Sequence, residues 1–198
     1  MSIHKLPDDL YDFQKIDSLK AASPGNWMLL HRMRMGKTPM SINVVEHNKY
    51  SIPLIICPNS LRLEWSRQIA EWTDEKCAVS VQNTYARLKN IIHSLTDGTK
   101  YKVINYETLR NKENFQLLTM IPFDIIIFDE VHQVRNPKTQ LTKAVWEFLK
   151  SQPQAKVLAL SGSPIMNYPN DLYVPLSMVN PQEYSPTQSG WREFMYGH

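Results

Sequence analysis

The chain has 198 residues, of which 42% are hydrophobic and 21% are charged, and its formal net charge is +3. These proportions are close to the averages for globular proteins, so they exclude a disordered segment and a coiled coil. The length allows one large domain or two small ones. The slight positive charge permits binding of nucleic acid but does not require it. Cys57 and Cys77 lack the spacing of zinc ligands, so we interpret them as thiols in a reducing compartment.

Neither a signal peptide nor a membrane span is visible in the sequence. The first residues, MSIHKLPDDLYDFQ, have no apolar core. The longest apolar runs have about five residues, whereas a helix that crosses a bilayer needs roughly 20. We therefore expect an intracellular, cytoplasmic protein with no membrane partner.

Short apolar runs alternate with amphipathic segments along the chain. The runs are typical of strands buried on both faces of a parallel sheet, and they predict strands at 26–30, 52–57, 78–81, 102–106, 124–128 and 156–160. Helical spacing of apolar residues is clearest in three sets: Leu61, Trp65, Ile69 and Trp72; Leu88, Ile91, Ile92 and Leu95; and Leu141, Ala144, Val145 and Phe148. This alternation predicts an α/β fold with a doubly wound, mostly parallel sheet and helices on both faces. After about Asn180 the period is lost, so we expect an irregular end at 181–198.

The first candidate for chemistry is Gly36-Lys37-Thr38, which follows the first predicted strand and its loop. In such a loop, backbone N–H groups and a helix N-terminus hold phosphate, the lysine contacts the β- and γ-phosphates, and the threonine hydroxyl binds Mg²⁺. The full GxxxxGK[ST] pattern is broken, because His31 stands where its first glycine belongs. A chance Gly-Lys-Thr at a helix start is therefore the alternative at this point.

The second candidate, Asp129-Glu130-Val131-His132, follows the strand predicted at 124–128. The carboxyl end of a central parallel strand faces the crevice in which α/β folds bind ligands. Asp129 would hold Mg²⁺, directly or through water, and Glu130 would orient and deprotonate an attacking water. The alternative is a pair of acids that opens a solvated loop, which the preceding apolar run and the upstream Gly-Lys-Thr disfavour.

The third candidate, Ser161-Gly162-Ser163-Pro164, follows the last predicted strand. Small hydroxyl side chains at a strand end can form hydrogen bonds to a neighbouring loop that carries carboxylates, but the same residues are also typical of an ordinary turn. The local chemistry leaves both interpretations open.

Taken in order, these segments resemble the first RecA-like lobe of a superfamily-two helicase-like ATPase of the Swi/Snf type. The resemblance implies a RecA-like P-loop NTPase lobe over residues 1–180. Six motifs carry it: LYDFQ at 10–14 (Q motif), HRMRMGKT at 31–38 (motif I), PLIICPNSLRLEW at 53–65 (motif Ia), VINYETLR at 103–110 (a nucleic-acid-side motif), FDEVHQVRNPKT at 128–139 (motif II) and LALSGSPIMN at 158–167 (motif III). LSMVNPQEY and WREF resemble the closing segment of that lobe.

The resemblance implies ATP and Mg²⁺ as cofactors and a role for each matching residue. Gln14 would read the adenine, and the phosphate loop would comprise His31, Arg34, Met35, Gly36, Lys37 and Thr38. The implied catalytic residues are Glu130 as the base, Asp129 and Lys37, and the implied metal ligands are Thr38 and Asp129. The residues implied to couple the nucleotide site to movement are His132, Ser161 and Ser163, and those implied to face the DNA backbone are Asn59, Ser60, Leu61, Tyr106, Arg135 and Lys138.

Departures from the family pattern fall mostly in motif I. His31-Arg32 replaces an Asp-Glu pair, and Arg34 replaces a common glycine, where an arginine would either add a phosphate contact or crowd the loop. In the DEAH box Val131 replaces an alanine, and in motif III two serines replace threonines and keep the hydroxyls. No catalytic group is lost.

The resemblance therefore implies the ATP-binding lobe of a DNA-dependent ATPase, preferably a translocase on double-stranded DNA. ATP would lie between this lobe and a second RecA-like lobe, in the same longer protein or on another chain, which would supply an arginine to the γ-phosphoryl group. Because no second lobe is visible in the sequence, we expect the chain alone to bind ATP weakly and to hydrolyse it very slowly. Two alternatives stay open. One is a non-catalytic module that binds DNA or protein and has a degenerate nucleotide site. The other is a small-molecule P-loop kinase, a class that has only Gly-Lys-Thr in common with this chain.

Overall fold

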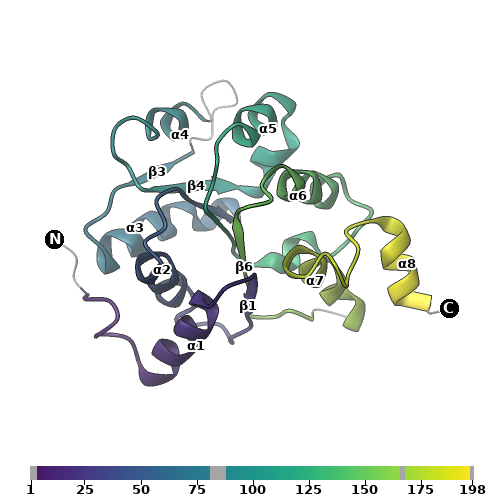
Figure 1. The fold of residues 1–198 in the computed structure, drawn as a ribbon, viewed down its shortest axis with the longest axis horizontal. Helices are drawn as coiled ribbons and strands as arrows, with labels where there is room; N and C mark the ends of the chain where they lie inside the picture. The colour runs from purple at the N-terminus through teal and green to yellow at the C-terminus, as the bar shows by residue number, and fades with distance from the viewer. Residues whose placement is uncertain (1–3, 81–87, 166–167, 197–198) are drawn as a thin grey trace.

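Six parallel strands form one sheet at the centre of the structure, a computed structural model that describes residues 4–80, 88–165 and 168–196. The strands lie in the order β1-β6-β5-β2-β4-β3 (Figure 1). Their bounds are Trp27–Leu29 (β1), Pro53–Cys57 (β2), Cys77–Val79 (β3), Tyr101–Asn105 (β4), Ile125–Phe128 (β5) and Lys156–Leu160 (β6).

Helices connect the strands and cover both faces of the sheet. The α-helices are Asp12–Ala22 (α1), Lys37–His47 (α2), Arg62–Trp72 (α3), Lys89–His93 (α4), Lys112–Thr119 (α5), Gln140–Ser151 (α6), Tyr173–Val179 (α7) and Gln188–Tyr196 (α8). Short 3-10 turns follow several strands: Asn59–Leu61 (η1), Tyr106–Arg110 (η2), Val131–Val134 (η3) and Pro169–Leu172 (η4). Helices α1, α2 and α3 pack on one face, and α4 to α7 pack on the other (Figure 1). Within the described ranges, no helix has the length and apolar character needed to cross a membrane.

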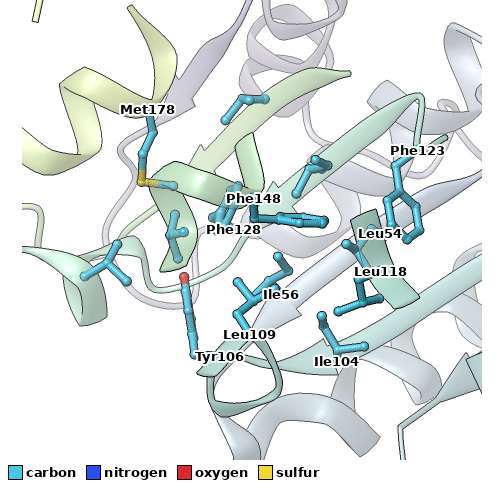
Figure 2. Close-up of a cluster of buried hydrophobic side chains, with 14 of the residues drawn as sticks. Leu54, Ile56, Ile104, Tyr106, Leu109, Leu118, Phe123, Phe128, Phe148 and Met178 are labelled. Atoms are coloured by element: carbon cyan, nitrogen blue, oxygen red, sulfur yellow. The ribbon is translucent and has the colours of Figure 1, made fainter. Parts of the chain in front are cut away.

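Side chains of each strand enter two different buried clusters, because successive residues of a strand point to opposite faces of the sheet. On β2, Leu54 and Ile56 join the cluster under α4 to α7, whereas Ile55 and Cys57 join the cluster under α1 to α3. Figure 2 shows the first of these clusters, which contains Ile56 from the sheet and Phe148 from α6. Burial on both faces explains why the strand sequences are apolar at nearly every position.

The predicted fold class is confirmed, since the sheet is doubly wound and each of its strand pairs is parallel. Strand β6 has the predicted bounds, and the other five strands differ from the predicted runs by one or two residues at their ends. Tyr106 leaves the fourth run because the chain turns into η2 there. Val81, at the end of the third run, lies outside the described residues.

The prediction of an irregular end at 181–198 is wrong, because residues 188–196 form α8. The Thr187 hydroxyl accepts the backbone N–H of Gly190 at 3.0 Å and caps the helix. The Phe194 ring lies 5.1 Å from the ring of Tyr173 on α7 and 6.1 Å from that of Tyr184. The helix is stabilised by these contacts with residues outside it, which the local sequence period does not reveal.

Candidate functional site

The loops that carry the sequence motifs leave the sheet at its carboxyl edge. Strands β1, β6, β5 and β2 are consecutive neighbours in the sheet. The loop after β1 spans residues 30–36, and the segments after β6, β5 and β2 begin at Ser161, Asp129 and Pro58. Motifs I, III, II and Ia, which are far apart in the chain, are therefore adjacent in space.

The loop 30–36 closes against Gln14 of α1. The Gln14 side-chain amide donates to the carbonyl oxygen of Met35 at 3.1 Å and accepts from the backbone N–H of Tyr11 at 2.9 Å. Gly36 ends the loop in the left-handed region, at φ +78°, and stands at the N-cap of α2. A Cβ at Gly36 would overlap the Gln14 amide nitrogen, so the loop needs glycine here for space as well as for its φ. Gln14 thus holds the loop, and its contact with adenine stays a prediction.

Lys37, the first residue of α2, places its ammonium inside this loop. Its Nζ donates to the carbonyl oxygen of His31 at 3.0 Å. It also lies beside Gly162 of motif III, where a Cβ would be 3.3 Å from Nζ. A positive charge and the free N–H groups at a helix N-terminus are what an anionic phosphate binds.

The substitutions in motif I leave the loop closed. Arg34 itself adopts the left-handed conformation, at φ +66°, and its side chain is exposed. His31 Nε2 lies 3.2 Å from Asp17 Oδ2, which ties the loop to α1. Both predicted effects of Arg34, a phosphate contact and crowding of the loop, stay predictions.

Asp129 is a buried carboxylate at the end of β5, 7% exposed. Its Oδ2 accepts the indole N–H of Trp65 at 2.8 Å, and its Oδ1 accepts the backbone N–H of Glu130 at 2.9 Å. Burial raises the pKa of the Asp129 carboxyl, while the Trp65 bond and the positive charge of Lys37 oppose this rise. The charge of Lys37 therefore acts on Asp129, as expected for two groups of one site.

Glu130 and the three predicted coupling residues form a connected chain. Glu130 has an uncommon left-handed backbone, at φ +49°. Its Oε2 lies 3.2 Å from His132 Nδ1, and the same nitrogen lies 3.4 Å from Ser161 Oγ. Ser161 Oγ in turn accepts the backbone N–H of Ser163 at 3.2 Å. The structure thus links the loop after β5 to the loop after β6.

The predicted DNA-facing residues of motif Ia lie in η1, directly after β2. Asn59 and Ser60 are exposed, and Leu61 is half-buried. Asn59 Oδ1 accepts the side-chain amide of Asn105 at 3.1 Å, which fixes η1 to the end of β4. Asn59 and Ser60 present polar side chains at the surface, and contact of the three residues with DNA stays a prediction.

Arg135 and Lys138 lie after η3, near the C-terminal helices. Arg135 Nη1 donates to the carbonyl oxygen of His132 at 3.2 Å, and its Nε lies 3.8 Å from Asp171 Oδ1. Lys138 is exposed, and its Nζ lies 5.5 Å from the centroid of the Trp191 ring. Both cations are accessible, and their contact with DNA likewise stays a prediction.

Tyr106 requires a correction, because its side chain does not face the surface. It is 2% exposed and belongs to the buried cluster of Figure 2. Its hydroxyl donates to the carbonyl oxygen of Asp129 at 2.8 Å. Burial leaves this side chain no surface for direct contact with a DNA backbone, and its observed role is to hold the end of β5.

Two contacts of the site are not predicted by any local sequence pattern. Helical spacing predicts Trp65 as a core residue, but no local pattern indicates its bond to Asp129. The pairing of His31 with Asp17 is equally hidden, since it joins a loop to the preceding helix. The only sequence signal is that Trp65 lies within the motif Ia segment.

The residues at this edge fit a nucleotide with Mg²⁺. Gly36 lets the Gln14 amide pack against the loop where a Cβ would overlap it, and Lys37 brings positive charge into the loop. Mg²⁺ prefers oxygen ligands, and the Asp129 carboxylate and the Thr38 hydroxyl supply them from β5 and α2. Thr38 and Asp129 would therefore hold the metal.

A Gly36→Ala substitution tests the loop. Alanine in the left-handed conformation costs roughly 1–2 kcal/mol, and the same cost applies to Gly98→Ala, because Gly98 has φ +77°. No atom lies within 4 Å of a Cβ at Gly98. We expect urea denaturation to show this loss of stability in both variants, with a larger loss in Gly36→Ala because its Cβ displaces the Gln14 amide, and calorimetry to show loss of nucleotide binding for Gly36→Ala alone. Equal nucleotide affinity in the two variants would contradict this account of the loop.

Comparison with known protein families matches residues 18–196 to the SNF2-related domain. The chain belongs to this family. The matched region contains motifs I to III and extends through α8. The resemblance to the Swi/Snf type that the motifs indicate is thereby confirmed.

Individual relatives of this SNF2-related domain are much longer proteins. The SWI/SNF-related matrix-associated actin-dependent regulator of chromatin subfamily A-like protein 1 of Xenopus tropicalis is 30% identical over 179 residues, which cover 89% of this chain and 18% of that protein. The ISWI chromatin-remodeling complex ATPase ISW1 of Saccharomyces cerevisiae is 27% identical over 168 residues, which cover 81% of this chain and 14% of that protein. The chain thus spans less than a fifth of the length of these relatives.

Solved structures confirm the RecA-like fold of the SNF2-related domain. The Sulfolobus solfataricus SWI2/SNF2 ATPase core in complex with dsDNA matches with a TM-score of 0.73 at 22% identity, covering 96% of this chain and 40% of that chain. The Pyrococcus furiosus Hef helicase domain matches with a TM-score of 0.70 at 17% identity, covering 90% and 38%. At these identities the likeness concerns the fold alone.

Proposed function

We propose that this SNF2-related domain is the ATP-binding lobe of a DNA-dependent ATPase that couples ATP hydrolysis to movement on DNA. One observation carries the proposal: three motifs meet at one edge of the sheet. Lys37 lies beside Gly162, and its positive charge partly offsets the rise that burial causes in the pKa of the Asp129 carboxyl. Membership of the SNF2-related family, and a relative named as a chromatin-remodeling ATPase, support it.

ATP and Mg²⁺ are the proposed cofactors. Lys37 and the backbone N–H groups at the start of α2 would bind the phosphates, and Gln14 would bind the adenine. Thr38 and Asp129 would hold Mg²⁺, which supplies positive charge to the phosphate oxygens when bound. The loop residues 31–36 would enclose the phosphate tail.

Glu130 is the proposed general base. Its carboxylate would orient a water molecule and accept its proton. Because His132 Nδ1 lies within 3.2 Å of Glu130 and 3.4 Å of Ser161, a shift of Glu130 would be passed to the loop that holds Ser163. This chain of contacts is the proposed route from the nucleotide site to movement.

Double-stranded DNA is the proposed partner, and translocation without strand separation is the proposed action. Asn59, Ser60, Arg135 and Lys138 would face the DNA backbone, since polar and positively charged groups make such contacts. Leu61 would lie at the same surface, because it belongs to η1 with Asn59 and Ser60. The dsDNA in the matching Sulfolobus structure supports this choice. A DNA partner would place the protein in the nucleoid or, in a eukaryote, in the nucleus.

Full turnover is proposed to need a second RecA-like lobe. An arginine that stabilises charge on the γ-phosphoryl group contributes about 10³–10⁵ in rate in related NTPases. We therefore expect the chain alone to hydrolyse ATP very slowly. Strong DNA-stimulated turnover by the purified 198-residue chain would contradict this part of the proposal.

Thermal unfolding with Mg-ATP tests the nucleotide site. A ligand at 100 times its Kd stabilises a folded protein by about 2.7 kcal/mol, so we expect Mg-ATP to raise the Tm of the wild-type chain. We expect no such rise for Lys37→Ala, which removes the charge from the loop. Lys143→Ala is the matched control, because Lys143 is an exposed lysine of α6, outside the nucleotide site.

The same experiment separates the proposal from its rival. If Mg-ATP does not raise the Tm of the wild-type chain, and the Tm of Lys37→Ala is equally unaffected, the nucleotide site is degenerate. The domain would then be a non-catalytic module that docks DNA or protein.

A further inference from the structure

One buried hydrogen bond joins helix α3 to the carboxyl edge of the sheet. The indole N–H of Trp65 donates to Asp129 Oδ2 at 2.8 Å, across 64 positions of the sequence. Both side chains are buried, Trp65 to 2% exposure. The indole N–H is a donor only, and a bond to a carboxylate is roughly twice as strong as one between neutral groups. In this contact Trp65 is therefore always the donor and Asp129 the acceptor, and the bond stabilises one orientation of the carboxylate.

A second donor completes the restraint on this carboxylate. Asp129 Oδ1 accepts the backbone N–H of Glu130 at 2.9 Å. Because the two oxygens have different donors, rotation of the carboxylate would break both bonds. Each carboxylate oxygen has two acceptor positions, so each keeps one for a metal ion or its water. The Glu130 N–H is part of the backbone, so among the described residues Trp65 is the side chain that donates a hydrogen bond to the Asp129 carboxylate.

Trp65 also lies close to the segment proposed to face DNA. Helix α3 begins directly after Leu61, the last residue of η1, and Trp65 is the fourth residue of this helix. Arg62 is buried at the start of this helix, and it donates to the carbonyl oxygen of Asn59 at 3.4 Å and to Ser80 at the end of β3. The segment η1 and the first turns of α3 are thus held together as one unit, and Trp65 connects that unit to Asp129.

We infer that Trp65 is a positioning residue for Mg²⁺ binding. Its indole N–H holds the Asp129 carboxylate in the orientation that binds the metal with the nucleotide, and it ties this carboxylate to the segment 59–61. The inference rests on the proposed function of the site. Hydrogen-bond partners of metal ligands are known to orient them, and their loss costs about 10–100-fold in metal affinity.

Calorimetry of ADP binding with and without Mg²⁺ tests the inference on the whole chain. The quantity measured is the gain in ADP affinity when Mg²⁺ replaces EDTA. We expect Trp65→Phe, which keeps an aromatic ring but removes the N–H, to reduce this gain about tenfold or more. The affinity for ADP in EDTA is expected to stay at the wild-type value, because the hydrogen bond that Trp65→Phe removes goes to Asp129 and not to the loop 30–36. A purely structural defect would lower both affinities.

Trp72→Phe is the matched control. Trp72 lies on the same helix, and its indole N–H donates to Gln68 Oε1 at 3.3 Å, away from Asp129. Its ring stacks on His4 at the surface end of the helix, with centroids 4.3 Å apart. We expect this variant to keep the wild-type magnesium gain.

Nuclear magnetic resonance gives a second measurement that does not depend on the folding of a Trp65 variant. The chain has five tryptophans, so the indole N–H region holds few resonances. We expect the Trp65 resonance to shift when Asp129 is replaced by asparagine. In the wild-type chain, we expect it to shift on addition of ADP with Mg²⁺ but not of ADP with EDTA. The Trp72 resonance is expected to stay in place in both experiments.

The outcomes separate this inference from the proposed function. A wild-type chain that binds ADP no better with Mg²⁺ than with EDTA contradicts the proposed function and this inference with it. A wild-type chain with a clear magnesium gain, beside a Trp65→Phe chain with the same gain, contradicts the inference alone. A Trp65 resonance that does not respond to Asp129→Asn or to Mg-ADP also overturns it.

Discussion

Replacing Glu130 with glutamine is expected to slow ATP hydrolysis by about 10²–10⁴-fold, because a general base contributes that much to the rate. Glutamine keeps the size of the side chain but cannot accept the proton of the attacking water. ATP binding should be retained, since Lys37, Thr38 and Asp129 are unchanged. Because slow hydrolysis is expected for the chain alone, the measurement is a single-turnover assay with radiolabelled ATP and excess protein.

The control for this substitution is Glu147→Gln. Glu147 is an exposed carboxylate of α6, so its loss changes the net charge equally without touching the site. We expect it to hydrolyse ATP at the wild-type rate. Hydrolysis by Glu130→Gln at that same rate would show that another group activates the water, and the role proposed for Glu130 would then be wrong.

The largest loss of stability is expected for Phe148→Ala. Phe148 is fully buried in the cluster of Figure 2, and its ring contacts Phe115 and Phe123 edge-on at centroid distances of 6.3 and 6.2 Å. Removing a buried phenylalanine ring leaves a cavity and costs about 3–5 kcal/mol. This is a large share of the roughly 5–15 kcal/mol by which domains are stable.

Urea denaturation measures this effect as a lower transition midpoint at an unchanged slope. Leu117→Ala is the comparison, because Leu117 lies on the neighbouring helix α5 but is 41% exposed. We expect the Leu117 variant to change the free energy of unfolding by about 0.5 kcal/mol or less. Equal effects of the two substitutions would mean that Phe148 does not carry the packing between α5 and α6.

Much of the fold follows from local sequence. The run Ile125–Phe128 is apolar at every position, and this alone predicts a strand covered on both faces. The helical spacing of Leu141, Val145 and Phe148 likewise predicts the buried face of α6, of which Val145 and Phe148 are fully buried. Such patterns are readable because strand and helix periods are properties of neighbouring residues.

Local sequence patterns do not predict the structure of a segment that is stabilised by distant residues. Helix α8 is short and depends on contacts of Phe194 with Tyr173 and Tyr184, so its sequence looks irregular in isolation. Tyr106 belongs to a motif that resembles a DNA-contacting segment, yet its ring is buried and its hydroxyl bonds to Asp129. Exposure is decided by which elements pack over a residue, and the local sequence does not contain that information.

Local sequence indicates the chemistry proposed for this protein: Gly36-Lys37-Thr38 as a candidate phosphate-binding segment, the acids Asp129 and Glu130, and the placement of both segments at strand ends. How these segments meet depends on the tertiary fold. The strand order β1-β6-β5-β2 brings Lys37 beside Gly162 and Trp65 to Asp129. Strand order is set by backbone hydrogen bonds and packing between distant segments, whereas periodicity and motifs depend only on neighbours along the chain.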